Sequence, residues 1–231
     1  MTSNKKNLFL LLGISLVSQA TTSLVGGLVG IGPFTETENM TVAMNSIAGN
    51  IGGVYAGIFL QIVTALVIVA LGAALYQTGK HISKTAAIIA FGFYLTEAIV
   101  HIISQVPIFS ITEVSGQFAS TGDVALLPIA KLLFAIRDFT GAITMMPFGL
   151  GAILFYFLIT KAKVIPKWLG IWGVVTVTFI LIGWSLEAFK VTSVPFALYI
   201  PYVPWEWVAG IYILIKGISI KSNVFADDSI T

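Results

Sequence analysis

The chain has 231 residues and a net charge of +2, and it is 57% hydrophobic but only 10% charged. Soluble domains carry about 25% charged residues, so this chain has too few charges to cover a surface that faces water. The mean hydropathy of +0.98 indicates instead that lipid surrounds most of the chain. Basic residues form no groove-sized patch, so we expect no nucleic-acid partner. The absence of cysteine excludes disulfides, thiolate metal sites and a cysteine nucleophile.

Six apolar runs are long enough to cross a bilayer, which takes about 20 helical residues. Only short polar segments separate the runs, and no linker or low-complexity tract divides the chain. The sequence therefore predicts one all-α domain over residues 1–231, a polytopic membrane protein with six transmembrane helices in one bundle. We expect the spans at about residues 8–32, 50–78, 85–106, 129–160, 168–189 and 195–218.

The first run has a second interpretation. Lys5 and Lys6 precede an apolar stretch that leads to Ser18-Gln19-Ala20, the pattern of a secretory signal peptide with a small-residue cleavage site. Cleavage there would leave five spans. The apolar stretch continues to Ile31, however, which is long enough to span a membrane, so we expect the first helix to remain in the bundle.

Basic residues fall on one side of the membrane if the chain crosses it six times. The opposite loops carry acids, at Glu36, Glu38, Glu113 and Asp123. By the positive-inside rule, we expect both termini in the cytoplasm of a cell whose plasma membrane holds the protein. Nine of the twelve basic residues share this side: Lys5, Lys6, Lys80, Lys84, Lys161, Lys163, Lys167, Lys216 and Lys221.

Glycines recur every four residues, at Gly26 and Gly30 and again at Gly49, Gly53 and Gly57. Small residues at this spacing let membrane helices approach one another closely. We interpret them as packing seams inside the bundle. A seam between two copies of the chain is the alternative, and the sequence leaves the oligomeric state open.

Polar residues inside the apolar runs are the candidates for a functional site. An ionisable residue at the bilayer centre costs about 2.5–3.5 kcal/mol, and such residues usually face a bundle interior or a cavity. Those found here come from four spans and lie mostly in the middle-to-outer half. We expect them to form one binding pocket, lined by Gln61, Tyr94, Glu97, His101, Arg137, Asp138 and Glu206.

The charge balance of this pocket suggests a role for each residue. Three acids, Glu97, Asp138 and Glu206, face a single arginine, Arg137, and a titratable His101. Uncompensated buried carboxylates keep a proton or recruit a cation. We expect Glu97 and Glu206 to accept a proton or cation, and Arg137 to be an anion contact or counter-charge. His101 would be a pH-sensitive neighbour. The partners implied are the lipid bilayer and a small solute or cation.

Two other interpretations stay open. Buried charges can fix helix packing alone, with Arg137 tied to Glu97 or Glu206, which would make the chain a structural or accessory membrane subunit. Alternatively, Glu97 and His101 lie one helical turn apart and could be the acid and base of an intramembrane hydrolase or transferase. Only one histidine lies within the spans, so a three-histidine zinc site is not available, and we expect no metal and no cofactor.

The last run places two prolines ahead of its acid, in YIPYVPWEWVAG. Pro201 and Pro204 each remove a backbone N–H. They either break a helix beside Glu206, as in several transporters, or simply open the helix near the outer surface. Trp205 and Trp207 favour the second interpretation, because indoles prefer the membrane interface.

Three stretches resemble a known family: FGFYLTEA (91–98), AIRDFTGAITMMPFGLGAILFYFLITKAKVIPKWLGIWG (135–173) and VPWEWVAGIYILIKGI (203–218). They are similar to the prokaryotic membrane family known as domain of unknown function 4386. The shared features are an Arg-Asp pair that opens the fourth span, a basic turn of Leu/Ile-Pro-Lys/Arg-Trp-Leu, and a Glu followed by an apolar run ending in Lys-Gly. The resemblance implies six spans in a prokaryotic membrane and no particular activity.

The resemblance also implies that Glu97, Arg137, Asp138 and Glu206 occupy recurrent polar positions of that family. Members often carry Arg where this chain has Tyr94, and an acid where it has Gln61. Because this chain lacks both the Arg and the acid, its net charge is the same as if it had kept the two. We therefore expect the second and third spans to touch at Gln61 and Tyr94.

Overall fold

The structure is a computed structural model that describes residues 2–34 and 39–220, and in this part of the chain it is helical without strands. Three short 3-10 turns, η1 (Gly32–Phe34), η2 (Phe196–Leu198) and η3 (Ile200–Tyr202), accompany the α-helices. The α-helices are α1 (Thr2–Val29), α2 (Met40–Ala48), α3 (Ile51–Gly79), α4 (Lys84–Ile103), α5 (Gln105–Thr121), α6 (Leu126–Lys161), α7 (Lys167–Ala188) and α8 (Val203–Ile218).

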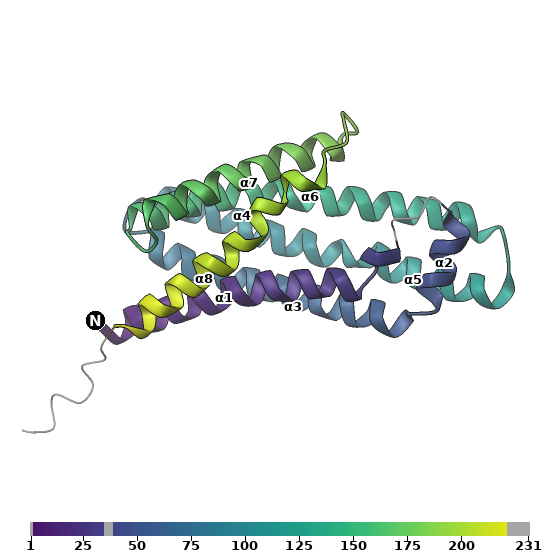
Figure 1. Cartoon of the computed structure of the whole chain (residues 1–231), viewed down its shortest axis with the longest axis horizontal. Coiled ribbons are helices and arrows are strands. Elements are labelled where there is room, and N and C mark those ends of the chain that lie inside the picture. Colours follow the sequence, from purple (N-terminus) through teal and green to yellow (C-terminus); the bar gives the residue numbers. More distant parts are fainter. Residues whose placement is uncertain (1, 35–38, 221–231) are drawn as a thin grey trace, which may run out of the picture.

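The long helices lie side by side in one bundle (Figure 1). Helix α1 packs against α3 and α8, helix α6 packs against α4 and α7, and α3 joins the two groups through α4. The start of α1, the α3–α4 turn, the α6–α7 turn and the end of α8 all lie at the end that holds the N-terminus (Figure 1). We call this the lysine end, because the segments that meet there carry the described lysines of the one-sided set. Lys221, Glu36 and Glu38 lie outside the described residues.

Five of the six predicted spans are confirmed as helical segments long and apolar enough to cross a membrane. The sixth run, 195–218, differs, because its regular helix α8 has only 16 residues. Such a helix is about 24 Å long, against a hydrocarbon thickness of about 30 Å. Five segments meet the length and hydropathy requirement: Asn4–Phe34, Ile51–Gly79, Lys84–Thr121, Leu126–Lys161 and Lys167–Ala188.

The prolines explain why α8 starts late. Pro201 lies in η3 and Pro204 lies in the first turn of α8, where a missing N–H has no helical partner to lose. The prolines thus open the helix rather than break it, and Glu206 is in its first turn. Trp205 is fully buried, so its indole packs inside the bundle rather than facing lipid.

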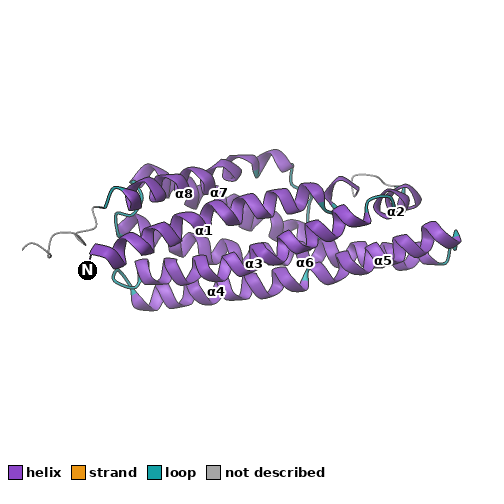
Figure 2. Cartoon of the chain, turned by 90° about the horizontal axis from the view of Figure 1, so that it is seen from below, coloured by secondary structure: helices purple, strands orange, loops and turns teal. Residues whose placement is uncertain are grey.

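Helices α2 and α5 are absent from the sequence prediction. Helix α5 follows α4 almost directly, and the combined 38-residue segment is about 57 Å long, nearly twice the hydrocarbon thickness. Together with α2 and the start of α6, α5 extends past the ends of α1, α7 and α8, at the end opposite the N-terminus (Figures 1 and 2). This extension has its own buried cluster, formed by Ile31, Ile47, Val54 and Ile111.

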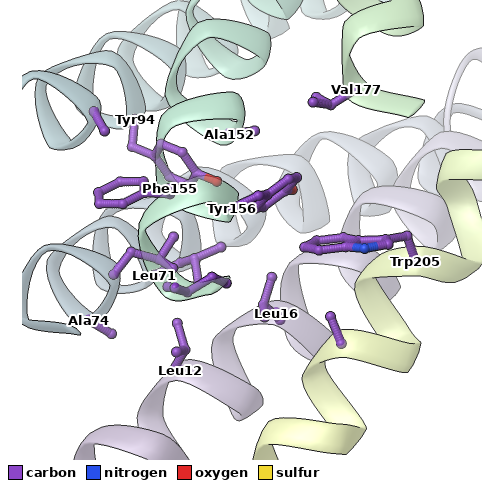
Figure 3. Packing of buried hydrophobic residues seen from close by; sticks show 14 of the residues in the cluster. Leu12, Leu16, Leu71, Ala74, Tyr94, Ala152, Phe155, Tyr156, Val177 and Trp205 are labelled. Atoms are coloured by element: carbon purple, nitrogen blue, oxygen red, sulfur yellow. The ribbon is translucent and has the colours of Figure 1, made fainter. Parts of the chain in front are cut away.

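The main core lies between α1, α3, α4, α6, α7 and α8 (Figure 3). Leu12, Leu71 and Phe155 are completely buried there, while Phe59, Ile171 and Ile215 on the outside are each more than 60% exposed. Large apolar side chains therefore occur both inside and outside the bundle. This distribution fits a surface that faces lipid rather than water.

The glycine seam between α1 and α3 confirms the prediction of close packing within the chain. A Cβ atom added to Gly57 would lie 2.5 Å from the Cα atom of Gly30. No side chain fits at that separation, so the two helices touch through their backbones. The first run is thus a helix that packs into the core of this bundle.

Candidate functional site

Glu97 and Glu206 belong to one buried polar cluster, although they come from different helices. Glu97 lies on α4 and is 4% exposed, and Glu206 lies in the first turn of α8 and is 8% exposed. Their charges are close enough to repel each other. The structure therefore brings together the two acids to which the sequence assigned proton or cation binding.

Glu206 is held by donors from two other segments. Its Oε1 accepts a hydrogen bond from the Tyr202 hydroxyl at 2.8 Å and from Gln19 Nε2 at 3.2 Å. The Tyr202 hydroxyl also lies 2.9 Å from the Tyr156 hydroxyl. We define the carboxyl cluster as Gln19, Tyr94, Glu97, Tyr156, Tyr202 and Glu206. It joins α1, α4, α6, α8 and η3.

The carboxyl cluster is not fully paired within the described residues. Glu97 Oε2 and Gln19 Oε1 are buried and have no hydrogen-bond partner there. The only ion pair in residues 2–34 and 39–220 joins Arg137 to Asp138, so neither buried acid has a cationic side chain within ion-pair distance. An unpaired carboxylate is very costly in an apolar interior, so the cluster needs a proton or a cation to neutralise it.

Aromatic rings pack against one another next to the carboxyl cluster. Tyr94 packs edge-on against Phe155 with 5.1 Å between ring centroids, and its hydroxyl interacts with Tyr156. On the other side, Tyr156 lies 4.0 Å from Trp205, centroid to centroid, and Trp205 Nε1 donates to the backbone oxygen of Leu169 at 2.7 Å. Tyr94, Tyr156 and Trp205 thus approach the centre of the bundle from three helices (Figure 3).

Small residues make room for these rings. A Cβ atom on Gly151 would lie 2.7 Å from the Tyr94 ring, and one on Gly173 would lie 2.5 Å from the Trp205 indole. The glycines at these positions therefore allow the two rings to pack closely against α6 and α7. The aromatic shell also excludes water, which strengthens electrostatic interactions inside it.

His101 belongs to a second group and does not reach the carboxyl cluster by hydrogen bonding. Its Nε2 lies 2.9 Å from Gln61 Oε1, while Gln61 Nε2 donates to the backbone oxygen of Ser23 at 3.2 Å. Because the second bond makes Gln61 Oε1 the acceptor, His101 Nε2 carries the proton in this arrangement. Glu97 and His101 share α4, but the hydrogen bond of His101 goes to Gln61 and not to Glu97.

The prediction that Gln61 and Tyr94 touch is wrong. Tyr94 packs against Gly72, which is eleven residues beyond Gln61 and about 16 Å further along α3. Helices α3 and α4 run antiparallel, so the residue opposite Gln61 must come from the end of α4, where His101 lies. The sequences of the two spans do not reveal which residue of α4 lies opposite a given residue of α3.

A small cavity of about 150 Å³ lies beside the His101–Gln61 pair. Gln61, Gln105 and Arg137 supply its polar lining, and the glycines of the α1–α3 seam supply much of the rest. Gln105 is 6% exposed and its Oε1 has no hydrogen-bond partner in the part of the chain that the structure describes. This polar cavity is separate from the carboxyl cluster, so the single predicted pocket is divided into two.

Arg137 and Asp138 pair with each other near the surface. The distance between Arg137 Nη1 and Asp138 Oδ1 is 3.1 Å, and their side chains are 24% and 66% exposed. The structural alternative expected Arg137 to be tied to Glu97 or Glu206. Arg137 forms no ion pair with either of these acids. Asp138 points outward and takes no part in the carboxyl cluster.

Sequence reasoning missed Gln19, Tyr156 and Tyr202. Gln19 is an amide inside an apolar run, a signal that was available but was interpreted as part of a cleavage site. The tyrosines gave no signal, because this residue is common at membrane interfaces. As for metals, no group of three His, Cys, Asp or Glu side chains among the described residues is placed to hold an ion.

Comparisons with known proteins give one match. The model of a family described as a domain of unknown function, DUF4386, matches residues 11–217. No curated protein and no solved structure matches the chain. The matched region includes every residue of the carboxyl cluster and of the small polar cavity.

Proposed function

We propose, from the premise that this chain belongs to the DUF4386 family of unknown function, that it is a membrane protein that binds a proton or small cation at the carboxyl cluster. Binding and release at this site would carry the ion across the membrane, alone or together with a small solute. The bundle would cross the plasma membrane of a prokaryotic cell six times, with both termini in the cytoplasm. The lysine end would then face the cytoplasm.

One observation carries the proposal. Glu97 and Glu206 are both buried, and neither has a cationic side chain within ion-pair distance in the described residues. Two such carboxyl groups favour sharing a proton or holding a cation between them. The other polar groups of the carboxyl cluster are compatible with either a proton or a cation as the ligand.

For a proton, the hydroxyls of Tyr202 and Tyr156 continue a chain of hydrogen bonds that starts at Glu206 Oε1, with steps of 2.8 and 2.9 Å. For a cation, Glu97 Oε2 and Gln19 Oε1 are oxygen atoms without a partner among the described residues. Oxygen ligands of this kind suit hard cations. The cluster therefore supports both forms of the proposal, which flux measurements can separate.

The structural role is the second candidate, and one observation favours it. Glu206 Oε1 accepts from Gln19 on α1 and from Tyr202 in η3, so this carboxyl group links segments that are distant in the sequence. A protein in which the acids only fix helix packing would keep this link but move no ion.

The test is ion flux into liposomes that contain the purified protein. We compare the wild type with Glu97→Gln and Glu206→Gln. Asp138→Asn is the control, because it removes an acid that is exposed and lies outside the carboxyl cluster. We expect each buried substitution to lower proton or cation flux by at least about tenfold, the effect of losing about 1.4 kcal/mol of binding. The control should keep wild-type flux.

Equal flux from all four proteins across protons, sodium and potassium would overturn the proposal. Lower thermal stability of Glu206→Gln without any flux in the wild type would favour the structural role. Infrared spectra give an independent readout, because a protonated carboxyl absorbs separately from an amide. Loss of such a band in Glu97→Gln or Glu206→Gln would identify the residue that holds the proton.

A further inference from the structure

A second and larger pocket opens at the lysine end of the bundle. Its volume is about 850 Å³, within the range of small-molecule sites. Four separate segments line it: the start of α1, the end of α3 with the turn after it, the α6–α7 turn, and the end of α8. Neither the carboxyl cluster nor the small polar cavity contributes a residue, so this pocket is independent of the proposed ion site.

Its charged lining is entirely basic. Lys5, Lys80, Lys163 and Lys216 line the pocket together with His81, and no acidic side chain of residues 2–34 and 39–220 does. Lys5 and Lys216 are close enough for their charges to repel each other. Repulsion between lysines drawn from different segments means that this end of the fold concentrates positive charge, and an anion placed there would relieve it.

Within the part of the chain that the structure describes, the pocket lysines also have no anionic partner. The ion pair of Arg137 and Asp138 is the only one that the described residues form, so none of their carboxylates neutralises this pocket. Lys5 lies over the ring of Phe9 instead, at 5.8 Å from the centroid, and Lys216 Nζ donates to the backbone oxygens of Lys163 and Val164 at 2.6 and 3.1 Å. These partners are neutral, which leaves the positive charge available to a ligand.

The remaining walls are apolar. Leu8, Phe9, Ile82 and Val164 line the pocket beside the lysines. A site with ammonium groups next to apolar walls complements an amphiphile, which has an anionic head and a hydrocarbon tail. In a bundle that spans the bilayer, this end lies at the level of the lipid headgroups, where basic pockets between helices bind anionic lipids.

We propose that this pocket binds an anionic phospholipid of the leaflet at the lysine end. The phosphate lies among Lys5, Lys80 and Lys216, and an acyl chain runs along the apolar wall. Free phosphate shares the headgroup chemistry but cannot use the wall. Lipid binding therefore requires both parts of the pocket, and each part can be removed separately.

The test is lipid binding to the full-length protein in mild detergent, measured by native mass spectrometry. The probes are phosphatidylglycerol, phosphatidylcholine with the same acyl chains, and inorganic phosphate. The variant Lys5→Gln/Lys80→Gln removes two charges from the pocket, and Lys131→Gln/Lys190→Gln removes two charges elsewhere. At about 1 kcal/mol per lysine, we expect phosphatidylglycerol affinity to fall about fivefold for each pocket lysine. The control should keep wild-type affinity.

A second variant examines the wall. Ile82 is 45% exposed, so Ile82→Gln changes the pocket without disturbing the core. It should weaken phosphatidylglycerol and leave inorganic phosphate unaffected. The proposal is overturned if both lysine double variants lose affinity equally, if phosphatidylcholine binds as well as phosphatidylglycerol, or if Ile82→Gln has no effect. None of these readouts depends on ion flux, so failure here is distinct from failure of the proposed function.

Discussion

Tyr202 is the residue on which the carboxyl cluster most depends. Its hydroxyl donates to Glu206 Oε1 and also lies within hydrogen-bond distance of the Tyr156 hydroxyl, so one oxygen atom connects α6 to the acid of α8. Both neighbours are buried and cannot turn to water for a replacement. Removing one partner of a buried hydrogen bond costs more than the bond itself contributes, because the other partner is left unsatisfied.

We therefore predict that Tyr202→Phe destabilises the protein. The ring stays in place and only the hydroxyl is lost, so the expected fall in the free energy of unfolding is about 1–3 kcal/mol. Tyr212→Phe is the matched control, because Tyr212 is 38% exposed and lies outside the cluster. Unfolding in detergent, followed by circular dichroism, measures the difference. Equal stability of the two variants would contradict the importance assigned to this hydroxyl.

At the scale of elements, the contact between α1 and α3 depends on glycine. Gly30 and Gly57 let the two backbones touch, and Gln61 bonds to the Ser23 carbonyl on the same side of the seam. Since lipid tails are as apolar as leucine, close packing and interhelical hydrogen bonds hold such helices together. The seam also positions Gln61 for His101.

Gly57→Ala should push the two helices apart. Its Cβ atom would lie 2.5 Å from backbone, which cannot rotate away as a side chain could, and overpacking of this kind costs about 1–3 kcal/mol. Gly27→Ala is the control, because a Cβ atom there meets nothing within 4 Å. We expect that variant to be neutral or up to about 1 kcal/mol more stable, from helix propensity. If Gly27→Ala lowered the denaturation midpoint more than Gly57→Ala, the proposed close contact between α1 and α3 would be refuted.

At the scale of the whole molecule, the alternation of helices places eight of the ten described lysines at the lysine end, while Glu113 and Asp123 lie toward the other end together with Lys131 and Lys190 (Figure 1). This separation is the basis for the orientation proposed above. The extension formed by α2, α5 and the start of α6 lies at the acidic end. It would therefore project from the outer face of the membrane.

Cysteine labelling tests this orientation directly, because the chain has no cysteine of its own. Ser120→Cys and Ser219→Cys are near-isosteric changes at exposed positions in opposite ends of the bundle. In intact cells, a membrane-impermeant maleimide should label Ser120→Cys, and it should label Ser219→Cys only after lysis. Labelling of both positions in intact cells would rule out six crossings with this orientation, and the reverse pattern would invert it.

Much of the fold could be predicted because hydropathy is a local property. A run of about 20 apolar residues is readable as a span without knowledge of its neighbours, and five predicted spans are found. Helix α5 was missed because Ser110, Glu113 and Gln117 interrupt its apolar residues, so it resembled a loop. Helix α8 was predicted too long, because hydropathy does not register the two prolines that delay its start.

The candidate site was only partly predictable. The high cost of burying an acid in lipid identified Glu97 and Glu206 from sequence, and the structure shows them in one cluster. The same argument also included Asp138, which is exposed, because a position along the chain does not say which way a side chain points. Of the aromatic rings near the acids, Tyr94 was predicted, whereas Tyr156 and Tyr202 gave no sequence signal.

The sequence by itself determined the solvent, the helical class and the residues whose burial would be costly, because each of these follows from composition and local hydropathy. The tertiary structure alone decided the partners of the buried groups: Gln19 and Tyr202 for Glu206, and Gln61 for His101. These pairings depend on the rotation of each helix about its axis and on its height relative to its neighbours. Both are set by packing between helices that are distant in the chain, and neither can be obtained from one segment alone.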